Sequence, residues 1–445
     1  RPDQAVKHRS DGRECREPST LSHLASSQFR KRLPSTSVQG SSGESRSNTN
    51  GDGTAEGLEG DDVMKVIIVG AGIAGLVAHH VCKKAGFEVE HYERQSHLGP
   101  AGAGIVLWSN GVKILMALGL GEPLEHIGHR LERIVTRTND GILLTEMPVG
   151  DFERKLGAPV YPVSRTDLQS LLVDAVGADN LHLGANCVRV EQNSSAATVY
   201  FENGHTATGD VVIGADGVHS VIRATVVGEV APRYAGIANW VGILPNDDLQ
   251  PEHIGYEFLG EGKRCGLLPL AGKRVYFGFA CAMKEGSPGR DGGRRRQLRD
   301  LFGDWPAPIP AILERFVESE LKYLEIHDLP PLARWSDRRV TLLGDAAHAT
   351  APTLGQGGCQ AMEDGILLAR CLGTTTLGVE DGLARYQAKR KERAEMIVTR
   401  SRKKLEILHA AQPGAYKELF AAIRASSVAE TMRAQEEMLE EGPFG

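Results

Sequence analysis

Three closely spaced glycines follow the apolar run VIIV. Gly70, Gly72 and Gly75 form the pattern GxGxxG. Glycines at this spacing permit a tight turn, let backbone amides approach a pyrophosphate, and let the next helix pack closely on the strand. Glu93 ends the next predicted strand, FEVEHYE, at a distance where a carboxylate can accept a hydrogen bond from a ribose hydroxyl. This combination predicts a dinucleotide site.

A second glycine-rich turn lies far along the chain, in GDAAHATAPTLGQGGCQAMEDG, residues 344–365. Asp345 follows the apolar run VTLLG, and Gly355, Gly357 and Gly358 lead into a helical pattern. A helix start lined by backbone amides can hold an anion or a carbonyl oxygen that gains negative charge. We therefore expect the backbone of this turn to lie against a ligand.

The elements that must position these residues are strands buried on both faces. VIIVG, VVIGADG and VTLLG are continuous apolar runs, which are typical of parallel strands in an open α/β sheet. Each run ends at or beside a candidate residue, namely Gly70, Asp216 and Asp345. Ligands of such sheets bind at the carboxyl ends of the strands, so these positions are expected to form two halves of one split site.

The segment between the second and third of these strands has a different pattern. RYAGIANWVGIL, HIGYEFLG, KRCGLLPLAG and KRVYFGFAC alternate and are separated by turn signals, which predicts antiparallel strands. The earlier segment ERIVTRTNDGILLTEMPV predicts a hairpin around its Asn-Asp-Gly turn. We expect residues 134–160 and 231–328 to form a β-sheet substrate domain inserted into the nucleotide-binding domain.

The composition is that of a globular protein and limits the kinds of partner. The 445 residues suffice for two or three domains, with 41% hydrophobic and 24% charged residues. A net charge of −6 provides no electrostatic basis for binding nucleic acid, and no apolar run is long enough for an integral membrane segment. The seven scattered cysteines include no CxxC pair, so we expect reduced thiols, no metal site and a cytoplasmic location.

Residues 1–62 differ from the rest of the chain. They are rich in Ser, Gly, Arg and Asp and have no apolar period, so we expect a disordered N-terminal extension. The segment lacks the apolar core of a secretory signal. Its Arg- and Ser-rich first half leaves targeting to an organelle open as the alternative location.

With GAGIAG, Glu93, GADG, GDAAH and GQGG in this order, the chain resembles the single-component FAD-dependent aromatic hydroxylases, the para-hydroxybenzoate hydroxylase type of flavoprotein monooxygenase. The resemblance extends over roughly residues 64–402. It implies FAD as cofactor, NADH or NADPH as electron donor, and O₂ as co-substrate. It also implies that Asp345 binds the ribityl chain, that residues 355–359 face the isoalloxazine ring, and that Asp216 serves FAD and the nicotinamide cofactor together.

The resemblance assigns further residues to FAD. Arg165, in YPVSRTDL, matches the family's flavin-contacting arginine, with a surface salt bridge as the structural alternative. Pro352 would form a rigid wall beside the ring. The full set implied for the cofactor is Gly70, Gly72, Ala74, Gly75, Glu93, Arg94, Arg165, Asp216, Asp345, Pro352, Gly355, Gln356, Gly357, Gly358 and Cys359.

The implied fold class is α/β, a Rossmann-like FAD-binding domain with an inserted antiparallel β-sheet substrate domain and C-terminal helices. We expect the FAD-binding domain to comprise residues 63–133, 161–230 and 329–400, and the C-terminal helical segment to comprise residues 401–445. The chain has a single GxGxxG, which fits a family that uses FAD and NAD(P)H with one Rossmann unit. We expect a monomer or a homodimer.

A narrower resemblance links RYAGIANW, GEGKRCGLLPL, RVYFGF and GQGGCQAMED to the urate-hydroxylating members of this family. It implies that Arg264 and Tyr276 act beside the flavin as catalytic residues and that Asn239 contacts the substrate. Arg supplies fixed donors for an anionic planar ring, and Tyr can orient the ring or relay a proton. The structural alternatives are a sheet-face ion pair for Arg264 and a core position for Tyr276. Gln356 and Gly357 complete the expected substrate contacts.

Two positions depart from the urate pattern. Thr353 stands where those enzymes have an acidic residue, and Val241 replaces the second polar residue of an NWN triplet. Both changes predict a less polar pocket, and a site built to hydrogen-bond urate would lose contacts that it needs. The motifs therefore predict the cofactor but not the substrate.

We expect an FAD-dependent, NAD(P)H-using monooxygenase that hydroxylates a small aromatic or heteroaromatic substrate, urate-like or phenolic. The family's cycle implies reduction of the flavin, a C4a-hydroperoxide formed with O₂, and oxygen transfer to an electron-rich ring. Two alternatives stay open. One is an FAD-dependent epoxidase or hydroxylase of a bulkier apolar secondary metabolite, and the other is a non-catalytic FAD-fold binding or escort protein.

Overall fold

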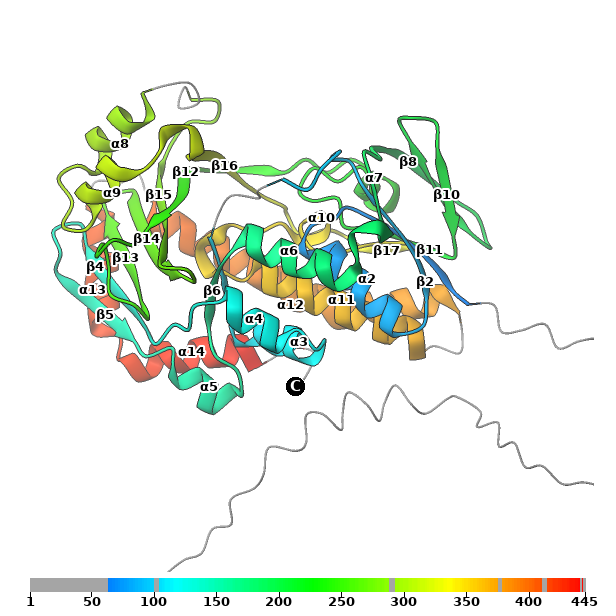
Figure 1. Cartoon of the computed structure of the whole chain (residues 1–445), viewed down its shortest axis with the longest axis horizontal. Helices are drawn as coiled ribbons and strands as arrows, with labels where there is room; N and C mark the ends of the chain where they lie inside the picture. The colour runs from blue at the N-terminus through cyan, green and yellow to red at the C-terminus, as the bar shows by residue number, and fades with distance from the viewer. Residues whose placement is uncertain are drawn as a thin grey trace, which may run out of the picture. The chain divides into compact units, whose positions relative to one another are not determined.

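The computed structural model describes residues 63–99, 104–287, 293–374, 378–409, 414–440 and 442. The first strand in these residues belongs to a mainly parallel sheet. The predicted extension 1–62 lies outside the described residues. Residues 60–445 form one compact unit, in which two large sheets are linked by long helices (Figure 1).

The first sheet has six strands in the order β17–β18–β11–β1–β2–β7, and all neighbours are parallel except β17 and β18. Val66, Ile67 and Ile68 of β1 are fully buried, as expected for a strand covered on both faces. The bounds are β1 (Lys65–Val69), β2 (Glu88–Glu93), β7 (Leu181–Leu183), β11 (Val211–Gly214), β17 (Ser336–Asp337) and β18 (Val340–Leu342). This is the Rossmann-like sheet that the sequence predicts.

Helices flank this sheet, and α2 and α11 pack directly against each other (Figure 1). A Cβ on Gly365 of α11 would lie 3.1 Å from the amide nitrogen of Ala78 in α2, so glycine permits this close approach. The helices of this part are α2 (Ile73–Lys84), α3 (Ser109–Ala117), α4 (Gly121–Ile127), α6 (Arg165–Val176), α7 (Ile222–Val227), α10 (Asp345–His348) and α11 (Gly357–Thr374), with short 3-10 turns η1 (Ala178–Asn180) and η3 (Pro352–Leu354).

The second large sheet has seven strands in the order β16–β12–β15–β14–β13–β4–β5. The predicted hairpin supplies β4 and β5, and the pairing is antiparallel throughout except between β4 and β13. The bounds are β4 (Arg133–Thr138), β5 (Leu143–Met147), β12 (Arg233–Pro245), β13 (Ile254–Gly260), β14 (Lys263–Leu270), β15 (Arg274–Ala282) and β16 (Lys322–Asp328). The expected substrate sheet therefore forms, with one parallel pair that was not predicted.

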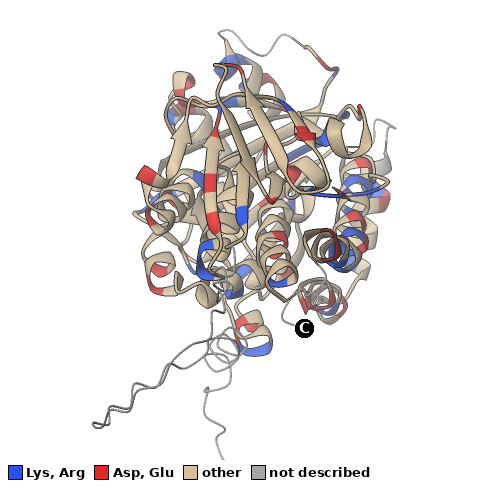
Figure 2. Ribbon diagram, turned by 90° about the vertical axis from the view of Figure 1, so that its right-hand side faces the viewer, with Lys and Arg blue, Asp and Glu red and all other residues tan. Residues whose placement is uncertain are grey.

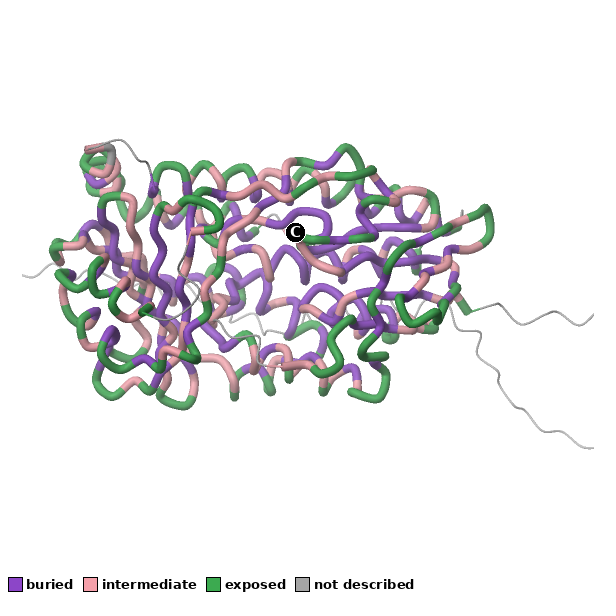
Figure 3. Tube along the Cα trace, turned by 90° about the horizontal axis from the view of Figure 1, so that it is seen from above, coloured by how far each residue is buried: buried purple, intermediate pink, exposed green. Residues whose placement is uncertain are grey.

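One face of the seven-stranded sheet is covered by α8 (Arg294–Phe302) and α9 (Ile309–Arg315), with η2 (Glu318–Glu320) following them. The side chains between them form a separate aromatic core. Buried residues accordingly run along the strands of both sheets (Figure 3). The two largest hydrophobic cores thus belong to the two large sheets.

Two small sheets complete the fold. β3 (Gly104–Leu107) pairs with β6 (Tyr161–Ser164). The other small sheet has the order β10–β9–β8, formed by β8 (Cys187–Gln192), β9 (Ala197–Phe201) and β10 (Thr206–Gly209). The β3–β6 pair matters for function because β6 contacts β14 of the substrate sheet, whereas β3 contacts α11.

The longest helix, α12 (Val379–Leu408), extends from the six-stranded sheet to the substrate sheet. The predicted start of a C-terminal segment at residue 401 falls inside this continuous helix. After it come α13 (Ala415–Ala425) and α14 (Val428–Glu440), and α14 contacts α5 (Asp151–Leu156) and β5.

Positions of basic and acidic residues are intermixed along the ribbon (Figure 2). The helix α12 carries charges of both signs, and ion pairs link Arg385 to Asp381 and Lys391 to Glu395. None of the described helices is both long and apolar enough to cross a membrane.

Candidate active site

The GxGxxG turn is packed too tightly for side chains at two of its glycines. Gly70 has a φ of +106°, and a Cβ there would lie 2.3 Å from the carbonyl oxygen of Ala215, directly after β11. A Cβ on Gly75 would lie 1.9 Å from the carbonyl oxygen of Gly70. By contrast, a Cβ on Gly72 would meet no heavy atom of the described chain within 4 Å. The turn therefore leaves open space at the start of α2, where a pyrophosphate could lie.

The start of α2 carries no negative charge of its own. Gly72 is its N-cap, its first turn has no acidic residue, and no described side chain caps it. The Glu93 carboxylate contacts the same turn. Its Oε2 accepts a hydrogen bond from the Ala71 amide at 2.7 Å, and its Oε1 accepts one from the Gln95 amide at 2.9 Å. Because a helix N-terminus attracts anions, this arrangement suits a diphosphate beside a ribose.

Three other residues assigned to FAD are Arg94, Ala74 and Arg165. Arg94 is exposed directly after Glu93. Ala74 is buried in α2, and a Cβ on Gly344 would lie 2.7 Å from its methyl group, so α2 and the second glycine turn touch. Arg165 is the exposed first residue of α6, and its side chain has no ion pair with any described residue. The salt bridge considered for Arg165 is therefore not formed among these residues.

Asp216 and Asp345 follow the carboxyl ends of neighbouring strands. β18, β11 and β1 are adjacent and parallel, so their ends lie side by side as predicted. Asp216 Oδ2 accepts hydrogen bonds from the amides of Val221 and Ile222, at 2.8 and 3.3 Å, whereas its buried Oδ1 has no hydrogen-bond partner among the described residues. Burial raises the pKa of Asp216. Asp345 is the exposed first residue of α10. An unpaired buried oxygen and an exposed carboxylate both favour a ligand at this edge.

Two buried side chains that the sequence analysis did not assign to the site support these strand ends. Arg223 Nη1 donates to the carbonyl oxygen of Ala346 at 3.2 Å, which ties the GADG segment to the GDAAH turn. Asp364 of α11 accepts the Gly344 amide at 2.9 Å and lies 2.6 Å from His348 Nε2. A charged pair inside the otherwise apolar helical pattern QAMEDGILL was the sequence signal for Asp364.

A buried ion-pair network extends from Asp364. Arg390 of α12 donates Nε to Asp364 Oδ1 and Nη1 to Glu363 Oε2, both at 2.7 Å. Its Nη2 donates to Gln360 Oε1 at 2.8 Å. All four side chains are buried. The network joins α11 to α12 and orients the carboxylate that holds the Gly344 amide.

Residues 355–358 form the turn into α11, as the glycine pattern predicts. A Cβ on Gly358 would lie 2.6 Å from Cδ1 of Ile105 in β3. The Gln356 side chain is buried, and its Oε1 accepts from Asn110 Nδ2 at 3.0 Å, whereas its Nε2 has no partner in the part of the chain that the structure describes. The first turn of α11 has no acidic residue. This helix start can therefore offer amide hydrogens to a ligand.

The flanking residues have distinct environments. Pro352 is exposed at the start of η3, and Gly357 is half-buried. The Cys359 thiol is buried against Gly111, where a Cβ would lie 2.7 Å from the sulfur, and burial raises its pKa to about 12. Only the backbone of Cys359 is thus placed to serve a cofactor.

Thr353 does not have the environment that the sequence comparison suggested. Its hydroxyl donates to the carbonyl oxygen of Ser401 in α12 at 2.6 Å, and its side chain is buried. The residue type at this position therefore affects the contact between the turn and α12. The prediction that Thr353 makes the pocket less polar is wrong, because its side chain is buried against α12. Val241 lies in the substrate sheet, paired with Gly278.

The predicted substrate residues share one face of the seven-stranded sheet. Asn239 and Arg264 both pair with Ala280, and Tyr276 lies four residues before Ala280 on β15. Since side chains alternate along a strand, all three point to the same side. The opposite face carries the aromatic core under α8 and α9, which includes Trp240, Phe258, Phe277 and Phe279.

Arg264 has an acidic partner that the sequence analysis did not identify. Its Nε donates to Glu257 Oε1 of β13 at 2.5 Å, and the two side chains are 25% and 16% exposed. Burial opposes ionisation of Glu257, but the positive charges of Arg264 and Lys404 outweigh it and lower the pKa of the carboxyl. The sheet-face ion pair considered for Arg264 is therefore present. Its terminal nitrogens have no hydrogen bond with described residues and remain available for a ligand.

Tyr276 links the substrate face to the second glycine turn. A Cβ on Gly104 would lie 2.6 Å from Cγ of Tyr276, so the ring packs directly on β3. The next residue of β3, Ile105, contacts Gly358 at the start of α11. Burial raises the pKa of Tyr276 to about 12. β3 therefore lies between Tyr276 and the start of α11, so the candidate substrate face lies close to the second glycine-rich turn.

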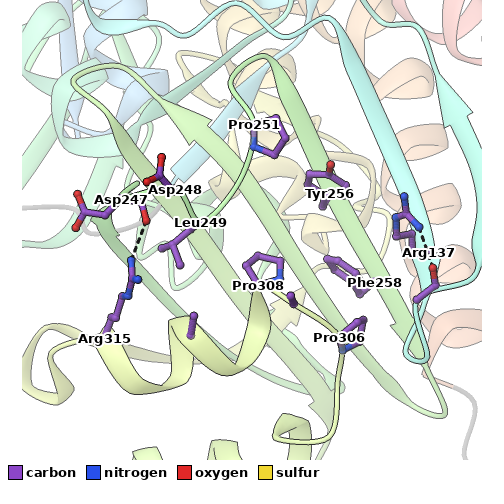
Figure 4. Close-up of a pocket in the computed structure, with 13 residues that line it drawn as sticks. Arg137, Asp247, Asp248, Leu249, Pro251, Tyr256, Phe258, Pro306, Pro308 and Arg315 are labelled. Atoms are coloured by element: carbon purple, nitrogen blue, oxygen red, sulfur yellow. Dashed lines mark hydrogen bonds between the residues drawn. The ribbon is translucent and has the colours of Figure 1, made fainter.

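A cavity of about 590 Å³ lies elsewhere on the substrate sheet (Figure 4). It is lined by Tyr256 and Phe258 of β13 and by residues around α9, with Arg315 donating to the Asp247 carbonyl oxygen at its edge. Tyr256 and Phe258 alternate with Glu257, so they face away from Arg264. None of the predicted site residues lines this cavity, and we do not assign it to the active site.

The assembled residues fit FAD. The open start of α2 and Glu93 suit its ADP part, whereas the unpaired Asp216 oxygen and Gln356 nitrogen lie at the other predicted contacts. A group of three His, Cys, Asp or Glu side chains suited to a metal ion does not occur in the described part of the chain.

Comparisons with known proteins agree with this assignment. Residues 63–401 match the FAD binding domain family. The FAD-dependent urate hydroxylase of Klebsiella pneumoniae is 36% identical over 349 residues, which cover 78% of this chain and 91% of that enzyme. The 3-amino-4-hydroxybenzoate 2-monooxygenase of Streptomyces cremeus is also 36% identical, over 355 residues, 78% of this chain and 89% of that enzyme.

A solved structure supports the same relationship. Klebsiella pneumoniae HpxO complexed with FAD and uric acid superposes with a TM-score of 0.82 at 34% identity, covering 86% of this chain and 98% of that one. The sheets, the glycine turns and these relatives lead to one conclusion. The chain belongs to the FAD-dependent aromatic hydroxylases, a group of flavoprotein monooxygenases within the FAD binding domain family.

Proposed function

We propose that this chain uses NAD(P)H and O₂ to hydroxylate a small aromatic or heteroaromatic substrate. The observation that carries the proposal is the contact chain from Tyr276 through β3 to the start of α11. It puts a polar sheet face with Arg264 and Asn239 beside the turn assigned to the flavin ring. When bound, FAD supplies electron transfer from NAD(P)H and the activation of O₂.

The chain's own residues would bind and orient the cofactor. The open amides at Gly72 and the Glu93 carboxylate would hold the ADP part, and Asp345 would hold the ribityl chain. The amides at the start of α11, at Gly357 and Gly358, would stabilise negative charge on a flavin carbonyl oxygen.

The substrate face offers matched polar groups. The terminal nitrogens of Arg264 can donate to an anionic oxygen of a planar ring. Asn239 Oδ1, which has no hydrogen-bond partner among the described residues, can accept a hydrogen bond from the ligand. The Tyr276 hydroxyl can orient the ring or hold a proton, since its raised pKa keeps it protonated near neutral pH. Packing of β3 and α11 against this face would limit the access of water.

The relatives support the same substrate class. One is named for urate and another for 3-amino-4-hydroxybenzoate, both of them planar rings that carry acidic and N–H groups. The ion pair between Arg264 and Glu257 would present a hydrogen-bond donor to the acidic group of such a ring and an acceptor to its N–H group. The sheet face thus favours a polar ring over a wholly apolar metabolite.

The test is flavin content followed by ligand-stimulated oxidation of NADH and NADPH. We expect the purified chain to bind FAD, and aromatic ligands to stimulate oxidation with formation of hydroxylated product. A chain that stays colourless with FAD would support a binding or escort protein instead. Stimulation by lipophilic compounds alone would support the epoxidase or apolar hydroxylase.

Arg264→Gln examines the substrate side of the proposal. Because it removes a charged donor but no FAD contact, we expect normal flavin content and a fall of about tenfold or more in product formed per NAD(P)H oxidised. Arg189→Gln, an exposed arginine on β8, is the matched control. Unchanged coupling in Arg264→Gln would remove this arginine from the site.

A further inference from the structure

Two glycines lie opposite each other on the candidate substrate face. Gly266 of β14 pairs with Gly278 of β15, and both belong to the face that carries Arg264 and Tyr276. A Cβ on Gly266 would meet no heavy atom of the described chain within 4 Å. A Cβ on Gly278 would lie 2.6 Å from the Tyr276 hydroxyl and 3.6 Å from Asn239 Oδ1. The Tyr276 hydroxyl therefore covers Gly278, and the sheet has a recess over Gly266 beside it.

The sheet register defines the two ends of the recess. A row of paired residues crosses four strands, in the order Val241, Gly278, Gly266 and Glu257. Strands in a sheet are about 4.8 Å apart, so Gly266 leaves an opening about one strand wide between the Tyr276 hydroxyl over Gly278 and the Glu257 side chain. The recess is wide enough for a substituent of an aromatic ring. The Tyr276 hydroxyl lies at one end, and Glu257 lies at the other with the positive charges of Arg264 and Lys404 near it.

The polar groups around the recess include two acceptors. The Asn239 Oδ1 atom is buried and accepts no hydrogen bond from any residue that the structure describes. Glu257 interacts with Arg264 Nε and with the Thr136 hydroxyl, but a carboxylate has about four lone-pair sites and can accept more. A ligand that filled the recess without a donor would leave Asn239 Oδ1 unpaired and would exclude water from the remaining lone pairs of Glu257. The chemistry of the recess therefore calls for a donor on the ligand.

The charges also limit the role of Arg264. Its guanidinium already neutralises Glu257 at 2.5 Å, so it is not an isolated cation waiting for an anion. Its free terminal nitrogens and the free lone pairs of Glu257 together match a ring that carries an acceptor next to a donor. A simple carboxylate clamp would not need the acidic residue.

We propose that the recess over Gly266 determines substrate specificity by taking an amino or ring N–H group of the aromatic substrate, with Glu257 as its acceptor. This inference rests on the proposed function, because it names the substrate class of the same site. Glu257 is a binding residue here, Gly266 provides the space, and Gly278 makes room for the Tyr276 hydroxyl at its edge.

The test compares ligands that differ in one amino group. Binding of 3-amino-4-hydroxybenzoate and 4-hydroxybenzoate, and of 2-aminophenol and phenol, is measured from the absorbance change of the FAD-bound protein. A charge-assisted hydrogen bond predicts that the amino member of at least one pair binds about tenfold or more tightly. Glu257→Gln should reduce that preference to about threefold or less, because the acceptor loses its charge. Glu252→Gln, at an exposed position outside the recess, should leave it unchanged.

A second variant tests the space itself. Gly266→Val would place its side chain in the open recess, so we expect unchanged FAD content and unfolding, and amino-ligand binding weaker by about tenfold or more. Ala282→Val adds bulk at an exposed position of β15 and serves as the control.

The outcomes separate this inference from the function on which it rests. No preference for the amino member in any pair, or unaltered ligand binding by Gly266→Val, would overturn the recess. Amino ligands that bind tightly and lose affinity in both variants, yet never stimulate NAD(P)H oxidation, would support the recess and contradict the proposed reaction. Turnover of ring ligands regardless of a donor would support the reaction and contradict the recess.

Discussion

The two halves of the candidate site use glycine in different ways. In the nucleotide half, glycine positions contact backbone, since a Cβ on Gly70 or Gly75 would approach a carbonyl oxygen within 2.3 or 1.9 Å. On the substrate face, a Cβ on Gly278 would meet the end of a side chain, and one on Gly266 would meet nothing in the described chain. A backbone atom cannot move aside for an added side chain without disrupting its helix or strand. The end of a side chain can move, and open space can hold the added atoms.

The difference teaches which part of the site can change without loss of the fold. The cofactor half is set by backbone contacts between strands and helices, so it tolerates few substitutions. The substrate half is set by side chains on a formed sheet, so its selectivity can change while its pairing stays. The predictions below test this contrast.

The largest effect is expected for Gly75→Ala. Its methyl group would overlap the Gly70 carbonyl oxygen, so we expect a loss of about 3 kcal/mol or more in the free energy of unfolding and no bound FAD. Gly72→Ala has space for its methyl group and should cost about 1 kcal/mol or less, while it weakens FAD binding by covering the open amides. Urea unfolding and the ratio of flavin to protein absorbance measure both effects. FAD binding by Gly75→Ala at the level of the parent would contradict the contrast.

How much the sequence could predict follows the same division. The first dinucleotide turn, the end of β2 at Glu93 and the strand ends at Asp216 and Asp345 were predictable, because each lies within a few residues of its own pattern. Glu257 was not, since its contact with Arg264 depends on how β13 and β14 pair. Residues joined by sheet register carry no local signal.

Thr353 shows a further limit of sequence comparison. Its substitution suggested a change in the pocket, but the hydroxyl faces α12 and bonds to the Ser401 carbonyl oxygen. Position in a motif predicts nearness to a ligand better than it predicts the direction of a side chain. The buried network of Arg390 was missed for a related reason, because α12 reads as a charged solvated helix from its composition.

Arg390→Met tests whether the cofactor half also depends on this network. The change would remove the partner that the buried carboxylates of Glu363 and Asp364 share, while Glu363 keeps Arg393 and Asp364 keeps His348. We therefore expect a cost near the lower end of about 3–5 kcal/mol of unfolding free energy. FAD should bind more weakly as well, because Asp364 holds the Gly344 amide. Arg385→Met removes a surface pair with Asp381 and should cost about 0.5 kcal/mol or less. Equal unfolding midpoints for the two variants would show that the buried network is not stabilising.

Acid should weaken the cofactor half through two buried histidines. Since the Gly70 carbonyl oxygen can only accept, His91 donates Nε2–H to it at 3.0 Å, and the neutral ring then accepts from His79 Nδ1 at 3.2 Å. Burial lowers the pKa of His91 to about 4 and that of His79 to about 3. Between these values and about 6.5 the unfolded chain binds more protons, so stability falls as pH falls through that window.

The size of this acid effect can be measured by urea unfolding at pH 7 and pH 5. Each histidine should lower the free energy of unfolding by roughly 2 kcal/mol over that interval, because pH 5 lies about 1.5 pH units below the pKa of histidine in the unfolded chain. His79→Leu should make the pH dependence shallower, and His126→Ala, at an exposed position of α4, should not. A pH dependence of the same steepness in His79→Leu and the parent would place the acid sensitivity elsewhere.

The smallest effect on stability is expected for Tyr276→Phe, which tests a single hydroxyl group of the substrate half. The ring would keep its packing on Gly104, so FAD content and unfolding should match those of the parent. Loss of the hydroxyl should lower product formed per NAD(P)H oxidised by about tenfold or less if it orients the ring. Tyr200→Phe, on the small sheet where the hydroxyl donates to Glu191, is the control for a generic loss of hydroxyl. Unchanged coupling would make Tyr276 a core aromatic, and the substrate face would then depend on Arg264, Glu257 and the glycine recess alone.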